Sequence, residues 1–136
     1  MRRMTLLIAC LAALAVASGS AGAATNKGSV ERTWISTTSG GKTATKFRAA
    51  SVKRLYANFT WKVPASAGQE LRIEWHDPSG SLRALWKDKT IKGDKKGTRL
   101  YAWIGSGLVK GALGGWRAVL LVGGKPIGTA KFRIMG

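Results

Sequence analysis

The sequence predicts an all-β protein, a single antiparallel β-sandwich of about seven strands. Several segments alternate apolar and polar residues with a period of two, which is the pattern of a strand with one buried face. Turns rich in glycine and proline separate these segments. No segment has a long helical period, and no repeat of about 20–50 residues is visible, which argues against a solenoid or a propeller.

Residues 1–23 have the organisation of a secretory signal peptide. Arg2 and Arg3 form a basic start, residues 5–16 form an apolar run too short to span a bilayer, and Ala21-Gly22-Ala23 is a small-residue cleavage signal. Leu7-Ile8-Ala9-Cys10 resembles the lipobox of bacterial lipoproteins, but Cys10 lies inside the apolar run with little apolar sequence before it. We therefore expect a secreted protein, extracellular or periplasmic, without a lipid anchor at Cys10.

The rest of the chain divides into a flexible N-terminal segment, 24–43, and a β-sandwich domain, 44–136. The segment 24–43 is polar and contains a candidate first strand at 30–36. A weaker strand candidate follows at 46–50. The clearest strand is 54–63, which ends before Pro64; its apolar positions are Leu55, Ala57, Phe59, Trp61 and Val63.

Turn residues predict how the later strands are joined. Asp77-Pro78-Ser79-Gly80 suits a tight turn, so residues 70–87 are expected to form a hairpin. A lysine-rich loop covers 87–97, and a glycine-rich connection covers 105–115. Gly123-Gly124 marks a second hairpin. Further strands are expected at 100–104, 116–122 and 130–134.

Four short motifs resemble the secreted immunoglobulin-like domains of bacteria, and fibronectin type III and macroglobulin-like modules have similar patterns. The motifs are Trp75-x-Asp77-Pro78-x-Gly80, Gly115-Trp116-Arg117-Ala118, Gly123-Gly124-Lys125 and Ala130-Lys131-Phe132-Arg133-Ile134, and the resemblance covers roughly residues 53–135. It implies a buried Trp75 on a central strand and a closing hairpin. The paired cysteines of antibody domains are absent, and function does not transfer with such a fold.

The strongest compositional feature is positive charge. The chain has a formal net charge of +17, and loss of Arg2 and Arg3 with the leader leaves +15. Such a field favours anionic partners, which outside a cell include wall polymers, lipopolysaccharide, acidic glycans, nucleic acid and membrane headgroups. The alternative is that the charge only keeps the protein soluble.

The residues needed for catalysis or metal binding are not clustered in the sequence. His76 is the only histidine, and Cys10 would leave with the leader. Glu70 and Glu74 would lie about 13 Å apart on one extended strand, beyond the spacing of glycosidase carboxylates. We therefore expect a non-catalytic protein with no cofactor, and we expect His76 to be a surface residue near a turn rather than a ligand.

Two surfaces are candidates for anion binding. The first is the lysine-rich loop, and its alternative interpretation is a solvated loop that protects a sheet edge. The second is an outer sheet face on which aromatic residues and cations interleave, and here the alternative is that Trp103 packs under a loop. The loop contributes Lys87, Lys89, Lys92, Lys95 and Lys96, and the face contributes Arg54, Tyr56, Lys62, Arg99, Tyr101 and Trp103.

A structural or protein-interaction module is the second functional class. Val119 and Leu121 occupy positions of their strand that point away from the core, and they would form an apolar face for oligomerisation.

In an immunoglobulin-like topology, the strands that carry Tyr56 and Tyr101 would be neighbours in one sheet.

We predict that the exported protein begins at Ala24 or within a few residues of it. The small-residue signal at 21–23 is the physical basis, and intact-mass measurement of the secreted protein tests it. A diacylated species that begins at Cys10 would contradict the prediction and support the lipoprotein alternative.

Overall fold

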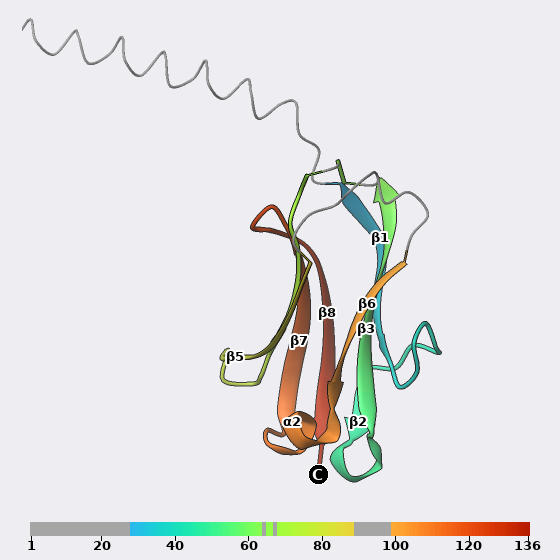
Figure 1. Cartoon of the computed structure of the whole chain (residues 1–136). Coiled ribbons are helices and arrows are strands. Elements are labelled where there is room, and N and C mark those ends of the chain that lie inside the picture. The colour runs from blue at the N-terminus through green and yellow to red at the C-terminus, as the bar shows by residue number, and fades with distance from the viewer. Residues whose placement is uncertain (1–27, 64, 67, 89–98) are drawn as a thin grey trace, which may run out of the picture.

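The computed structural model describes residues 28–63, 65–66, 68–88 and 99–136. Within them, eight strands form two sheets that pack face to face, which confirms the predicted β-sandwich (Figure 1). The elements are β1 (Ser29–Ser36), β2 (Lys46–Arg48), the 3₁₀ helix η1 (Ala49–Ser51), β3 (Arg54–Val63), β4 (Leu71–His76), β5 (Leu82–Asp88), β6 (Arg99–Gly105), the helix α2 (Ser106–Lys110), β7 (Gly114–Val122) and β8 (Lys125–Met135).

The smaller sheet has the order β1-β3-β6, and all its strands are antiparallel. β3 has the predicted bounds, and the predicted neighbourhood of Tyr56 and Tyr101 is confirmed because β3 pairs with β6. Leu55, Ala57 and Phe59 are almost completely buried, as the alternation of that strand requires.

The larger sheet has the order β2-β8-β7-β4-β5. β4 and β5 form the predicted hairpin, whose turn is closed by a hydrogen bond from the Gly80 N–H to the Asp77 carbonyl. β7 and β8 form the second hairpin, in which Gly123 and Gly124 have positive φ angles of 58° and 81°. Two consecutive positive φ angles suit glycine and match the twist of the strands that the turn connects. Among the described strands, β2 pairs in parallel with β8, and the other pairings are antiparallel.

The sandwich begins earlier than the expected boundary at residue 44. β1 lies within the segment 24–43, yet it pairs with β3 along its whole length and buries Trp34 and Ile35. It also approaches the larger sheet, since the Thr33 hydroxyl donates to the Thr129 carbonyl at 3.0 Å. This close approach uses Gly128, where an added Cβ would lie 3.2 Å from a Thr33 methyl group.

The glycine-rich connection at 105–115 contains the short helix α2, which the alternation pattern did not predict. Its buried residue is Val109, and the helix packs against η1. Within the described part of the chain, no helix combines the length and apolarity needed to cross a bilayer.

The core lies between the two sheets, and aromatic rings fill the part beside β8. Trp75 is 1% exposed, which confirms its predicted burial. Its ring meets Phe132 edge to face with centroids 5.9 Å apart, and Trp116 stacks on the same phenylalanine at 6.1 Å. The only cysteine of the sequence is Cys10, outside the described residues, so packing rather than a disulfide stabilises this core.

We predict that Trp75→Ala lowers the free energy of unfolding by about 3–5 kcal/mol, because truncating a buried aromatic leaves a cavity. Urea denaturation measures the loss. Leu82→Ala is the matched control, since Leu82 is 48% exposed and its truncation should change stability little. Equal effects of the two substitutions would contradict the proposed core.

Candidate functional site

The predicted aromatic and basic residues come together on the outer face of the smaller sheet. Strand pairing places Tyr56 opposite Trp103 and Thr60 opposite Arg99. The positions between them face the core, so these side chains point outward. We call this surface the aromatic–arginine face; its residues are Arg32, Trp34, Arg54, Tyr56, Lys62, Arg99, Tyr101 and Trp103.

Three arginines of this face lie against aromatic rings. The guanidinium carbon of Arg54 is 4.1 Å from the Trp103 ring centroid, and that of Arg99 is 4.9 Å from the Tyr101 centroid. Trp103 is 48% exposed, so the alternative in which it packs beneath a loop is wrong for the described residues. The contacts hold cations at fixed positions on the surface by cation–π attraction.

The third pair, Arg32 and Trp34 on β1, was missed by the sequence analysis. Its guanidinium carbon lies 4.3 Å from the Trp34 ring centroid. The β1 pattern gave a weak signal because the strand register shifts between Ser29 and Arg32, which interrupts the alternation. Glu31, the only acidic residue of these three strands, lies at the same irregularity.

Asn58 lies at the centre of the face, at a position of β3 from which side chains point away from the core. Its side chain is completely buried. The Oδ1 atom accepts hydrogen bonds from the Gly40 N–H at 2.9 Å and from Arg99 Nη1 at 2.8 Å. The Nδ2 group donates to Ser36 Oγ at 2.9 Å and to the Trp34 carbonyl at 3.3 Å. Asn58 thus joins β1, β3, β6 and the loop after β1, and it fixes the position of Arg99.

The remaining predicted anion-binding residues are only partly described. Lys62 is exposed near the end of β3. Lys87 is exposed and forms an ion pair with Glu70 at 3.4 Å. Lys89, Lys92, Lys95 and Lys96 lie outside the described residues, so the lysine-loop prediction stays a prediction.

Glu74 of the larger sheet and Asp77 of the turn after β4 are already engaged in ion pairs. Glu74 pairs with Arg72 at 2.9 Å and with His76 at 3.0 Å, and Asp77 pairs with Arg83 at 3.1 Å. Among the described residues, most other lysines and arginines have no ion pair with a carboxylate. The positive charge of the described surface is therefore largely uncompensated.

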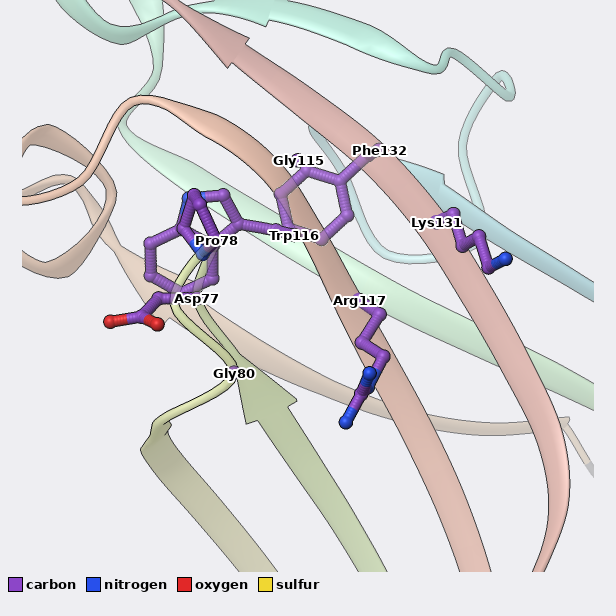
Figure 2. A pocket seen from close by; sticks show the side chains of 8 residues that line it. All are labelled: Asp77, Pro78, Gly80, Gly115, Trp116, Arg117, Lys131 and Phe132. Carbon is purple, nitrogen blue, oxygen red and sulfur yellow. The ribbon is translucent and has the colours of Figure 1, made fainter.

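A small hollow of about 280 Å³ adjoins the turn between β4 and β5, beside Gly115 and Trp116 on β7 (Figure 2). Asp77 lines it, but its carboxylate points away from the basic side chains of the hollow. The Ser79 hydroxyl donates to this carboxylate and is the largest cause of a pKa lowered from 3.8 to about 2; Arg83 and backbone N–H groups add to the effect, and burial opposes it.

The lowered pKa of the folded-state Asp77 carboxyl group determines how its contribution to stability depends on pH. The bonds to the Asp77 carboxylate stabilise the turn above the group's ordinary pKa of 3.8. That contribution is lost as the pH falls towards the folded-state pKa of about 2. Asp77 is thus a structural anion of the turn.

Val119, Leu121 and His76 are the other residues of the larger sheet that the sequence singled out. Val119 is only 9% exposed and Leu121 is half-buried, so the expected apolar oligomer face is small. His76 bonds to Glu74, its neighbour along the strand. No group of three or more His, Cys, Asp or Glu residues that could hold a metal ion occurs in the described part of the chain.

We predict that Asn58→Ala lowers the free energy of unfolding by about 2–3 kcal/mol, because it leaves several buried partners without a hydrogen bond. The matched control is Thr60→Val on the same face, since the Thr60 hydroxyl is buried without a partner among the described residues. Chemical denaturation compares the two variants. A loss for Thr60→Val as large as that for Asn58→Ala would contradict the role given to Asn58.

Neither a protein-family model nor a curated protein sequence matches the chain. Solved structures do resemble it. An immunoglobulin-like protein of Pseudomonas aeruginosa superposes with a TM-score of 0.53 at 10% identity, covering 79% of this chain and 95% of that chain.

Two larger proteins give lower scores, and this chain spans under a third of each. An alkylpurine DNA glycosylase of Pseudomonas fluorescens, bound to DNA, has a TM-score of 0.44 at 12% identity, covering 82% of this chain and 31% of that chain. A β-glucosidase of Listeria innocua, in complex with glucose, has a TM-score of 0.47 at 10% identity, covering 79% of this chain and 15% of that chain. The first likeness and the strand topology together show that the fold is an immunoglobulin-like β-sandwich.

Proposed function

We propose that this chain is a secreted, non-catalytic binding module that engages anionic extracellular polymers. The candidates are a cell-wall polymer, an acidic glycan, lipopolysaccharide or nucleic acid. The observation that carries the proposal is the aromatic–arginine face, where Arg32, Arg54 and Arg99 lie on aromatic rings and Glu31 is the only acid of the three strands.

The chemistry of the face suits a polymer that has both rings and charges. A guanidinium stacked on a ring keeps its N–H groups at the edge, where they can donate to phosphate, sulfate or carboxylate oxygens. The exposed parts of Tyr101 and Trp103, which are 45% and 48% accessible, offer aromatic surface to sugar rings or bases.

The surrounding charge supports the same proposal. Uncompensated cations on a small domain create a positive field that speeds the arrival of a polyanion. The lysines between positions 87 and 96 would extend this field as flexible point charges. The basic start, short apolar run and cleavage signal of the leader support export, so the partners are sought outside the cytoplasm.

We predict that affinity for a labelled single-stranded oligonucleotide falls linearly on a plot of log affinity against log salt, because binding releases counterions. Arg54→Gln should make the slope shallower by up to about one unit. Trp103→Ala should cost about 1–3 kcal/mol of binding free energy with little change of slope, because stacking is lost rather than charge. Fluorescence anisotropy measures both effects.

Two substitutions away from the face are the matched controls. Lys110→Gln removes an exposed cation on α2, and Leu113→Ala truncates a side chain that is 54% exposed. Each should weaken binding less than its counterpart on the face. An affinity that stays constant from low to high salt would rule out the electrostatic proposal and favour a protein partner.

A further inference from the structure

A second charged surface lies on the outer face of the larger sheet, where like charges oppose each other across strands. Arg117 of β7 pairs in register with Lys131 of β8, and Lys46 of β2 pairs in register with Arg133 of β8. All four side chains are exposed. Figure 2 shows Arg117 and Lys131 projecting from the two neighbouring strands. We call these four residues the cation-pair face.

This arrangement destabilises the free protein. Like charges directly opposite each other on neighbouring strands repel, whereas a carboxylate at either position would attract. None of the four forms an ion pair with a described carboxylate. The acidic residue nearest in the strand register, Glu74, lies opposite Val119 and is held by Arg72 and His76. The repulsion is therefore uncompensated within the described chain.

The four cations form two pairs, one across the antiparallel pairing of β7 with β8 and one across the parallel pairing of β2 with β8. Each pair joins one arginine and one lysine across a strand spacing of about 4.8 Å. Lys131 and Arg133 are two residues apart on β8, so the pairs are separated by about 7 Å along the strand. Each pair presents two positive charges and the planar donor fork of an arginine within reach of one anionic group.

Gly115 leaves room for such a group. It is exposed and opposite Arg133, and a Cβ added there would meet nothing within 4 Å. The hollow beside it is lined by Arg117 and Lys131. The backbone of β7 is thus uncovered beside Arg133, two residues before Arg117.

We propose that the cation-pair face binds two adjacent phosphomonoester groups of an anionic ligand, one group for each pair. This proposal rests on the proposed function and specifies one ligand chemistry and a second surface for it. A phosphomonoester has a charge of about −1.5 to −2 at neutral pH and three acceptor oxygens, so it balances two cations at once. A carboxylate or a phosphodiester has only a single charge for the same pair.

Inositol hexakisphosphate is a suitable probe because it presents adjacent phosphomonoesters on a small ring. Inositol hexasulfate is the matched probe with singly charged groups. We expect the wild-type protein to bind the phosphate probe more tightly in calorimetry. Lys131→Gln should weaken that binding on the order of tenfold, because a charge-assisted hydrogen bond is lost. Lys110→Gln should weaken it less than about threefold, as expected from a change in net charge alone.

A second readout separates binding from simple loss of structure. Lys131→Gln removes the cross-strand repulsion, so it should raise the melting temperature of the ligand-free protein at low salt while it weakens binding. Gly115→Leu should reduce binding of the phosphate probe without changing any charge, because it fills the uncovered position. Circular dichroism of both variants verifies that the fold is retained.

Three results would overturn the proposal: equal affinity for the two inositol probes, an effect of Lys131→Gln no larger than that of Lys110→Gln, or no binding of the phosphate probe. If the oligonucleotide still binds with its salt dependence, the proposed function stands and only the cation-pair face is rejected. If the wild-type protein binds neither probe nor oligonucleotide, both proposals fail.

Discussion

The packing of Phe132 is the constraint on which the larger sheet depends. Its ring lies at the centre of three aromatic contacts, with Phe47 of β2, Trp75 of β4 and Trp116 of β7, at centroid distances of 5.9 to 6.1 Å. Each of these rings points from its strand into the core, so the residues directly before and after it in that strand must point outward. The core therefore dictates which side chains form the charged outer face of the larger sheet, although it does not dictate their chemistry.

Most of the fold could be predicted because its strongest signals are local. Alternation along 54–63 located β3, and the turn at 77–80 located the hairpin of β4 and β5. The alternation of apolar and polar residues failed as a signal where a strand is irregular or where a helix interrupts the strands. A register shift interrupts β1, and α2 is only one short helix of five residues within a glycine-rich stretch. Trp34 therefore stayed outside the expected domain, although it packs beneath the loop that Asn58 holds.

The candidate sites were predicted less completely because they depend on pairing between distant residues. The aromatic–arginine face could be predicted since two clear strands carry most of it. The cation-pair face could not, because a two-residue turn at Gly123-Gly124 with regular pairing would place Arg117 opposite the core residue Ala130. The irregularity between Leu120 and Leu121 shifts the register by one residue and brings Arg117 opposite Lys131. A regular turn would pair an outward-pointing residue with a core residue, and this conflict indicates that the register shifts somewhere in the hairpin. It does not indicate at which residue the shift occurs.

The place of β8 in the chain also governs the order in which the molecule can fold. β8 pairs with β7 beside it in sequence and with β2, where residue 46 meets residue 133. Until the residues of β8 are present, Trp75 and Trp116 lack their common packing partner and β2 has no strand to join. Contacts between such distant residues place the domain among slowly folding β topologies. We therefore expect the larger sheet to be completed only after β8 has been synthesised, because β2 and β7 both pair with it.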